Sequence, residues 1–446
     1  MGMARALLLG ALVVATAACA GRREATTQPN ILVVSLDALR ADHLSCYGYD
    51  RPTSPVLDRL AARGTRFSHA FANTHGTPPS HTTLFSSLYQ ETHGVDLVAE
   101  DAKQKRHHVP PEVGLVQEIL RNNGWRTVGV TGGGYMASEF GFARGFEEFS
   151  DRARGVDDGA RQLADRVCGE AADNRPVFAF LHTYEVHSPY EPPDEYARLF
   201  VEREGAVEVS NEALVAIQNQ AAKVLTREDF EYLESLYDGE IRYTDTVLER
   251  LFSELETCGF LDGAVVIVTS DHGEEFGEHG GLLHRGTLYE ELIHVPLIIA
   301  GAGVEVGVVD PALVSLIDVA PTILTVAGLP VPGVMEGRSL LSRPPVASWP
   351  DQSVFSQYGS HLYSIRTPRW KLIDRPAVGR SELFDLRRDP GETRDVAAEQ
   401  PEVARKLLDE LMAWRQARSR RHDHEGPAAE ISEATRNDLR ALGYAE

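Results

Sequence analysis

The chain has 446 residues, of which 43% are hydrophobic and 25% charged, values that exclude a disordered or collagen-like protein. Its 66 Asp and Glu residues outnumber 44 Lys and Arg residues, and the net charge of −22 argues against a nucleic-acid-binding protein, which needs a basic face. A solvated acidic surface explains most of this charge, so acidity alone does not indicate a metal site. The four cysteines form no Cys-x-x-Cys pair, which excludes a zinc ribbon.

Residues 1–19 have the pattern of a signal peptide. Arg5 precedes an apolar run over 6–18 that is too short to span a bilayer, and small residues then flank Cys19 as in a bacterial lipoprotein cleavage site. We predict a lipid anchor at Cys19, with plain secretion as the alternative, and a tether over 20–29. The protein would then face the periplasm or the cell exterior. The three remaining cysteines permit at most one internal disulfide, and the sequence does not identify the pair.

From residue 30 onward, strand-like and helix-like segments alternate along the chain. Strands are predicted at 31–36, 126–131, 177–183, 264–269 and 296–300. Helices are predicted at 54–63, 112–123, 158–171, 228–258 and 314–327. This alternation predicts βαβ units, that is, a parallel sheet with helices on both faces.

A stretch rich in Pro, Ser and Arg at 335–352 has the composition of a domain edge. Beyond it, three short strand-like pieces and a charged helix over 400–418 predict a small α+β subdomain; the pieces are 353–358, 362–374 and 382–386. We therefore divide the chain into a catalytic domain at 30–345 and a C-terminal subdomain at 346–446.

Two of the predicted strands end in residues that bind hard metal ions. Asp37 follows the first strand, and Asp271 and His272 follow the strand at 264–269. Active sites form beyond the carboxyl ends of parallel strands, so we expect these three side chains to meet. Either aspartate alone could simply cap the helix that follows, but two such endings in one sheet favour a metal site.

Thr77 stands at the start of a helix-like segment that lies between these strands in the sequence. Pro78 and Pro79 suit a first helical turn, so we expect Thr77 to be the N-cap. Its hydroxyl would then lie at the positive end of a helix, where a phosphate or sulfate group binds, and beside a cation it would become a nucleophile. The simpler interpretation is a helix start without catalytic function.

Many ordered segments resemble a sulfatase of the alkaline phosphatase superfamily. They are 30–43, 46–49, 54–61, 77–95, 187–190, 270–274, 284–291, 295–298, 317–322 and 383–392. The resemblance spans about residues 30–445 and implies an α/β fold. Its large, alkaline phosphatase/sulfatase-like sheet is rich in parallel strands and flanked by helices, and a smaller C-terminal α+β subdomain carries an antiparallel sheet. It also implies a divalent cation below the nucleophile.

By position, the resemblance assigns metal binding to Asp37, Thr77, Asp271 and His272. It makes Thr77 the nucleophile as well. It further implies that His187 and His284 contact the transferred group or protonate the leaving oxygen. The alternatives are a turn histidine beside Pro189 and a surface histidine in a glycine-rich loop.

Three positions depart from the pattern of the formylglycine sulfatases. Thr77 stands in place of the cysteine, His81 in place of the arginine, and Ala38 in place of a second aspartate after Asp37. A threonine is not converted to formylglycine, so we expect none here. Two aspartates, one histidine and a hydroxyl form a smaller and less oxygen-rich set than calcium prefers, which leaves calcium, manganese and zinc as candidates.

A threonine at the nucleophile position resembles that of the phosphoethanolamine and phosphoglycerol transferases. A threonine ester cannot collapse to an aldehyde and must be cleaved by water or by an acceptor alcohol. We predict a metal-dependent hydrolase of phosphate or sulfate esters, acting on a small-molecule, glycan or lipid ester through a covalent Thr77 intermediate. The alternatives are a phospho-group transferase, although such enzymes usually carry several transmembrane helices, and an inactive binding descendant of the family.

Two further motifs carry less weight. Residues 130–137 fit the pattern G-x-G-x-x-A, but they lie far from the first strand, so a loop turn is favoured over a dinucleotide site. The run His-Asp-His-Glu at 422–425 could bind a metal, but its flanking residues favour a solvated linker.

Overall fold

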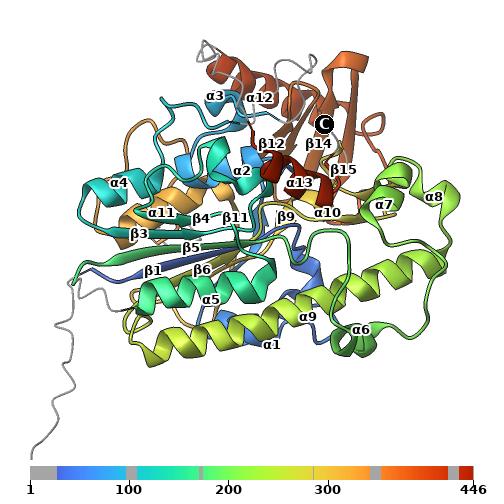
Figure 1. The fold of residues 1–446 in the computed structure, drawn as a ribbon. Helices are drawn as coiled ribbons and strands as arrows, with labels where there is room; N and C mark the ends of the chain where they lie inside the picture. Colours follow the sequence, from blue (N-terminus) through green and yellow to red (C-terminus); the bar gives the residue numbers. More distant parts are fainter. Residues whose placement is uncertain are drawn as a thin grey trace, which may run out of the picture.

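The computed structural model describes residues 28–96, 108–169, 174–284, 286–341, 353–419 and 431–444. The predicted signal peptide with Cys19, most of the tether, and the 422–425 motif lie outside these residues. Among the helices that are described, none has the length and apolarity needed to cross a membrane. A large sheet with helices on both faces carries a second, smaller sheet at one edge (Figure 1).

The large sheet has nine strands in the order β11-β2-β10-β6-β1-β5-β3-β4, with β9 paired to β2. The strands are β1 (Ile31–Leu36), β2 (Gly64–Phe71), β3 (Arg126–Val130), β4 (Glu148–Ser150), β5 (Val177–Thr183), β6 (Val265–Thr269), β9 (His294–Val295), β10 (Leu297–Gly301) and β11 (Val308–Ser315). At the centre, β1 pairs in parallel with β5 and with β6, whereas β10 runs antiparallel to its neighbours. The predicted parallel-rich fold class is confirmed.

Helices cover both faces of this sheet because its central strands are apolar on both sides. Leu32 and Val34 of β1 pack toward α1 (Pro55–Ala62), α5 (Gly155–Cys168) and α9 (Arg227–Thr257). Ile31 and Val33 point the other way, toward α2 (Thr77–Ser86), α4 (Val116–Asn122) and α11 (Val319–Val326). Successive strand residues alternate between faces, so a continuous apolar run is what a doubly covered strand requires.

Seven further α-helices and one hairpin lie outside the two sheets. They are α3 (Gln90–His93), α6 (Asp194–Phe200), α7 (Asn211–Ile217), α8 (Ala221–Val224), α10 (Glu290–Ile293), α12 (Pro401–Ser419), α13 (Glu433–Ala441), β7 (Glu275–Phe276) and β8 (Leu282–Leu283).

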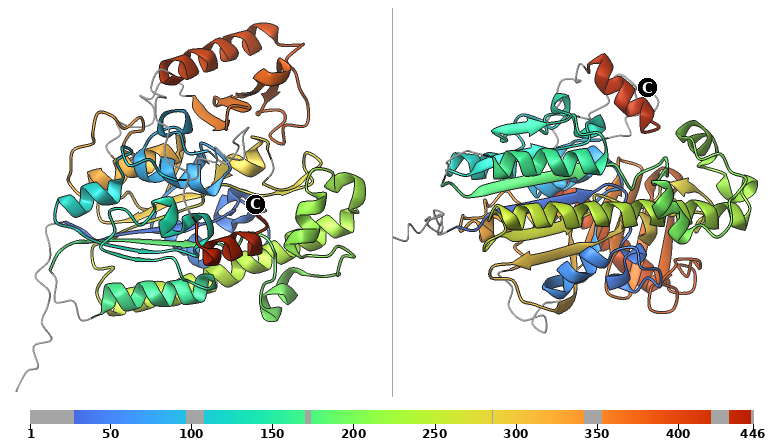
Figure 2. Two further views of the ribbon diagram at one scale, coloured as in Figure 1. Left: turned by 45° about the horizontal axis from the view of Figure 1, so that its top comes forward. Right: turned by 60° about the horizontal axis from the view of Figure 1, so that its bottom comes forward.

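The smaller sheet is antiparallel and has the order β12-β13-β14-β15. Its strands are β12 (Val354–Tyr358), β13 (Leu362–Arg366), β14 (Trp370–Arg375) and β15 (Arg380–Asp385). The helix α12 packs on it through Leu407, Leu411 and Trp414 (Figure 2, left). The edge strand β12 also bonds to the chain that leads into α2: Gln357 N donates to Asn73 O at 2.9 Å, and Asn73 Nδ2 donates to Phe355 O at 2.9 Å.

The structure corrects three details of the sequence interpretation. The predicted helix at 314–327 starts two residues too early: 314–315 end the strand β11, a 3-10 turn follows at Leu316–Asp318, and the α-helix covers Val319–Val326. The strand β2 was not predicted, because its sequence GTRFSHAF mixes Gly, Arg, Ser and His with apolar residues near the edge of the sheet. The antiparallel β10 was expected to be parallel.

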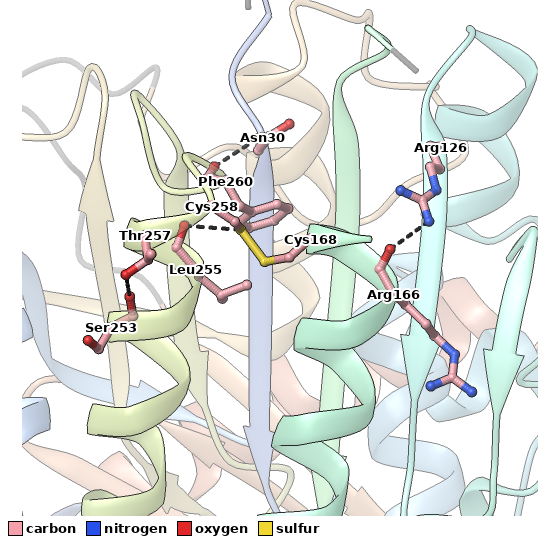
Figure 3. The surroundings of a disulfide bond; sticks show 9 residues. All are labelled: Asn30, Arg126, Arg166, Cys168, Ser253, Leu255, Thr257, Cys258 and Phe260. Atoms are coloured by element: carbon pink, nitrogen blue, oxygen red, sulfur yellow. Dashed lines mark hydrogen bonds between the residues drawn. A yellow bond between two sulfur atoms is a disulfide. The ribbon is translucent and has the colours of Figure 1, made fainter. Parts of the chain in front are cut away.

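A disulfide joins Cys168 and Cys258, at the ends of α5 and α9 (Figure 3). Of the cysteines that the structure describes, Cys46 is the one left free.

Candidate active site

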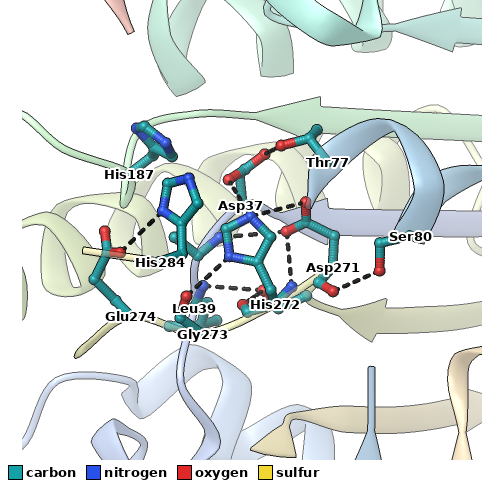
Figure 4. A network of polar contacts seen from close by, with 12 residues as sticks. Asp37, Leu39, Thr77, Ser80, His187, Asp271, His272, Gly273, Glu274 and His284 are labelled. Atoms are coloured by element: carbon teal, nitrogen blue, oxygen red, sulfur yellow. Dashed lines mark hydrogen bonds and ion pairs between the residues drawn. The ribbon is translucent and has the colours of Figure 1, made fainter. Parts of the chain in front are cut away.

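Three of the four predicted metal ligands meet at the carboxyl ends of two neighbouring strands. Asp37 follows β1, while Asp271 and His272 follow β6, and β1 pairs directly with β6. One ligand atom from each residue lies within 4.8 Å of the others, and all three side chains are buried (Figure 4). The expected convergence of these side chains is therefore observed.

Backbone contacts fix the two turns that carry these residues. Ala38 N donates to Asp271 Oδ1 at 3.3 Å, and Leu39 N donates to Ser270 Oγ at 2.9 Å, so the turn after β1 is tied to the turn after β6. Ala38 adopts the left-handed conformation, with φ of 60°, which costs an L-residue about 1 kcal/mol. This local cost is offset by the contacts that hold Asp37 in place.

Three atoms of this cluster have no hydrogen-bond partner among the described residues: Asp37 Oδ1, Asp271 Oδ2 and His272 Nε2. His272 Nε2 lies 3.6 Å from the first of these oxygens and 3.5 Å from the second. Such spacings suit atoms that share one cation through bonds of about 2.0–2.4 Å. Buried unpaired acceptors are costly, so the donor set fits a divalent cation.

The electrostatics of the cluster agree with this fit. Burial raises the pKa of Asp37 and that of Asp271, because two carboxylates without solvent favour the neutral form. Burial opposes the charged form of His272, but the two carboxylates prevail and raise its pKa. His272 Nδ1 lies 2.9 Å from Gly273 O, an acceptor, so Nδ1 carries a proton and Nε2 is the ring atom left to bind a cation.

Thr77 is the first residue of α2 rather than its N-cap, which corrects the sequence expectation; Gly76 occupies the cap. Because Pro78 and Pro79 have no amide hydrogen to cap, the helix start needs no side-chain acceptor. The hydroxyl is therefore free for another contact, and Thr77 Oγ1 donates to Asp37 Oδ2 at 3.2 Å. The structure thus places Thr77 beside the metal-ligand cluster.

His81, which stands where formylglycine sulfatases have an arginine, contacts the first residue of α2 and the strand β1. Its Nδ1 lies 2.9 Å from Thr77 O, and its Nε2 lies 2.9 Å from Ser35 Oγ. Burial lowers the pKa of His81 to about 4, so the imidazole is neutral near pH 7. His81 therefore does not supply the positive charge of an arginine.

His187 and His284 lie side by side next to the cluster, with ring centroids 4.9 Å apart. His187 Nδ1 lies 2.7 Å from Ser188 O, and His284 Nδ1 lies 3.1 Å from Glu274 Oε1. The side chain of His284 is 13% exposed, which argues against a surface histidine. Burial lowers the pKa of both imidazoles in this ligand-free arrangement.

Three residues near the cluster were not identified as site residues from the sequence. His182 Nε2 lies 3.2 Å from Asp37 Oδ2, and the only signal was a histidine near the end of an otherwise apolar strand. Tyr184, just beyond β5, packs against His182 with ring centroids 4.6 Å apart. Tyr444 reaches His284 and His187 from the far end of the chain, across 160 and 257 residues, and no local pattern predicts such contacts.

Two family models match this chain. The sulfatase model covers residues 29–329, and the model of the C-terminal region of N-sulphoglucosamine sulphohydrolase covers residues 277–417. The chain belongs to the sulfatase family. The predicted ester hydrolase agrees with this membership, and the triple-glycine turn at 132–134 lies within the sulfatase match rather than in a dinucleotide-binding fold.

Individual sulfatase relatives show the same likeness. Arylsulfatase K of Rattus norvegicus is 32% identical over 201 residues, which span 42% of this chain but only 36% of that protein. N-acetylglucosamine-6-O-sulfatase of Bacteroides thetaiotaomicron is 24% identical and aligns over 87% of this chain and 86% of its own length. The crystal structure of a phosphonate monoester hydrolase of Agrobacterium radiobacter superposes with a TM-score of 0.71 at 22% identity, over 88% of this chain and 96% of that one. This last likeness confirms the fold.

Proposed function

We propose that the protein is a metal-dependent hydrolase of phosphate or sulfate esters that works through a covalent intermediate on Thr77. The observation that carries this proposal is the contact between Thr77 Oγ1 and Asp37 Oδ2. The other oxygen of the same carboxylate is one of the three unpaired atoms of the cluster. The hydroxyl therefore lies at the edge of the position that a cation would take, at the start of a helix.

Asp37, Asp271 and His272 would hold the cation, with the hydroxyl of Thr77 as a further ligand. A divalent cation bound there would neutralise charge on the transferred group and lower the pKa of the hydroxyl. Calcium, manganese and zinc remain the candidates, and the nitrogen ligand favours the latter two. The threonine excludes formylglycine at this position.

The chain's own residues account for the bond changes. Thr77 Oγ1 attacks phosphorus or sulfur, and its proton passes to Asp37 Oδ2, the present acceptor of its hydrogen bond. The bond to the leaving oxygen breaks, and that oxygen keeps the electron pair and takes a proton from His187 or His284. Water then gives a proton to the same imidazole and attacks the Thr77 ester, and the threonine oxygen recovers its proton from Asp37.

The histidines must carry a proton for the first step. In the ligand-free structure burial lowers the pKa of His187 and that of His284. An anionic ester placed between them would raise both values, since a nearby negative charge favours the imidazolium form. Substrate binding would thus prepare the general acid.

The test compares aryl esters as substrates of the purified chain from residue 20 onward, supplied in turn with Mn²⁺, Zn²⁺ and Ca²⁺. A phosphate monoester, a phosphodiester, a phosphonate monoester and a sulfate cover the ester classes that the names of the relatives include. We expect Thr77→Ala to lower turnover by at least about 10⁴-fold and Thr77→Ser to retain part of it. Acid quenching should trap a phosphoryl or sulfuryl group on the Thr77 peptide.

Other outcomes would separate the alternatives. Turnover that survives in Thr77→Ala would refute the threonine nucleophile. Turnover that requires an added alcohol would indicate a transferase, and metal binding without any turnover would indicate a binding protein.

We also propose that a lipid on Cys19 anchors the enzyme to a bacterial membrane, facing the periplasm or exterior. The supporting observation is the apolar segment that ends in small residues around this cysteine. Replacing Cys19 by serine should move the protein from the membrane fraction to the soluble fraction; an unchanged distribution would contradict the anchor. The substrate would then be a small-molecule, glycan or lipid ester of the cell envelope.

A further inference from the structure

The last described segment of the chain, residues 431–444, returns to the candidate active site. Its helix α13 packs against the 3-10 turn Gly134–Met136 that follows β3, apart from α12, which precedes it in the sequence (Figure 2, left). Ser432 N donates to Glu139 Oε2 at 2.9 Å, and Asn211 Nδ2 donates to Ala441 O. Leu439 is 4% exposed and belongs to the core cluster on that side of the sheet. The segment is therefore packed into the fold at both of its ends.

The glycine turn after β3 leaves room for this segment. Gly133 and Gly134 have φ of 73° and 54°. A Cβ on Gly134 would lie 2.6 Å from Leu442 Cδ1, and one on Gly133 would lie 3.2 Å from Asp438 Oδ2. A larger residue at position 134 would press on the side chain of Leu442, and one at position 133 would press on Asp151 O at 2.9 Å as well as on Asp438, so the turn packs closely against the segment. This contact gives the triple glycine at 132–134 a structural role.

The fit places the hydroxyl of Tyr444 between two imidazoles of the site. It lies 3.1 Å from His284 Nε2 and 3.3 Å from His187 Nε2. The Nδ1 atoms of both rings already bond elsewhere, to Glu274 and to Ser188 O. Nε2 is therefore the atom through which each ring can act on a substrate, and Tyr444 contacts both of these atoms.

Tyr444 offers a neutral donor at this point. The phenol of a tyrosine is protonated near pH 7, so it can donate a hydrogen bond. The ring of Tyr444 packs against Tyr135 with centroids 4.6 Å apart, which fixes the direction of the hydroxyl. Such a fixed donor stabilises negative charge that develops on a nearby oxygen.

We propose that Tyr444 is a catalytic residue whose hydroxyl donates a hydrogen bond to the leaving oxygen of the bound ester. This inference rests on the proposed function, in which His187 or His284 protonates that same oxygen. The hydroxyl lies within hydrogen-bond distance of the two nitrogens that the leaving oxygen would approach, and it can donate its hydrogen to one of them at a time, so a small shift brings it onto the substrate. The C-terminal segment thereby completes the site.

The test uses Tyr444→Phe, which keeps the ring and its packing and removes only the hydroxyl. Tyr196→Phe is the matched control, because Tyr196 lies on α6 and packs against Tyr243 with centroids 5.2 Å apart, away from the cluster. For the ester class that the wild type hydrolyses, phenyl and 4-nitrophenyl esters are compared. We expect Tyr444→Phe to lower kcat about 100-fold for the phenyl ester and clearly less for the 4-nitrophenyl ester. A merely structural role would lower both rates equally.

A second readout does not depend on turnover. Inorganic phosphate presents an oxygen where the leaving oxygen would lie, and we expect its affinity, measured by calorimetry with Mn²⁺ present, to fall about tenfold in Tyr444→Phe. If the wild type hydrolyses no ester but this loss is seen, the proposed function fails while the Tyr444 contact stands.

Two results would overturn the inference. One is unchanged phosphate affinity together with unchanged or equally reduced rates for the two esters. The other is a rate that rises in Tyr444→Phe or on removal of residues 431–446, which would show that the segment blocks the site.

Discussion

We expect the substitution Asp271→Asn to stabilise the protein when no metal is bound and to make it less stable than the wild type when metal is bound. Asp271 is fully buried, and its Oδ1 accepts hydrogen bonds from Ala38 N and His272 N. An asparagine keeps those bonds through its own oxygen, so its NH₂ group replaces Oδ2. That group would face His272 Nε2 and Asp37 Oδ1, both of which lack a hydrogen-bond partner among the described residues.

The magnitudes follow from these contacts. Without metal, the new amide can donate to the two unpaired acceptors, and at about 1 kcal/mol for each bond the variant gains roughly 2 kcal/mol over the wild type. With metal at about 100 times its Kd, the wild type gains about 2.7 kcal/mol, while the variant gains almost nothing because its NH₂ group faces the cation. The order of stability of the two proteins therefore inverts.

Thermal unfolding followed by circular dichroism, in EDTA and in excess Mn²⁺, measures both differences. Asp262→Asn is the control, since Asp262 is an exposed aspartate in the turn after α9 and should retain the metal-induced shift of the wild type. The reasoning is refuted if Asp271→Asn retains that shift, or if it is less stable than the wild type in EDTA.

Three further predictions concern the scaffold. Burial and the nearby carboxylate of Glu185 raise the pKa of Glu240 to about 9, so the free energy of unfolding of the wild type should decline as the pH rises from about 4.5 to about 9. In urea unfolding, Glu240→Gln should lack this decline and be more stable than the wild type by roughly 2 kcal/mol at pH 9. Parallel pH profiles of the two proteins would contradict this. Replacing Cys168 and Cys258 by serine opens a cross-link between residues 90 apart and should lower the free energy of unfolding by about 4 kcal/mol, whereas an unchanged denaturant midpoint would mean that the cross-link does not matter. Asp245 accepts bonds from the first amides of α1, so Asp245→Ala should cost about 1 kcal/mol in thermal unfolding and Asp245→Asn less, and equal losses would count against a capping role.

The sequence predicts best what depends on neighbours along the chain. The apolar run of β1 requires cover on both faces, and a ligand placed directly after a buried strand must emerge at the edge of the sheet. The convergence of Asp37, Asp271 and His272 could be predicted for that reason. Even there, the N-cap was misplaced by one residue, because the two prolines that follow Thr77 remove the need for a side-chain acceptor.

Features that depend on distant contacts could not be predicted. His182 has the sequence context of an ordinary core residue, and only the register of β5 against β1 brings it to Asp37. The disulfide pair follows from where α5 and α9 end, and Tyr444 from the path of the last helix. The polar strand β2 is defined by its pairing with β10 and β11 rather than by its own residues.

The bonds between β12 and Asn73 also bear on how such a chain can diversify. The peptide that leads into α2, the helix that begins at Thr77, is held partly by a strand of the smaller sheet. A C-terminal sheet borrowed from a relative would have to present the same backbone groups at the same positions, or Thr77 would lose its support. We therefore expect new specificities in this lineage to arise from changes in surface loops, with the two sheets inherited together.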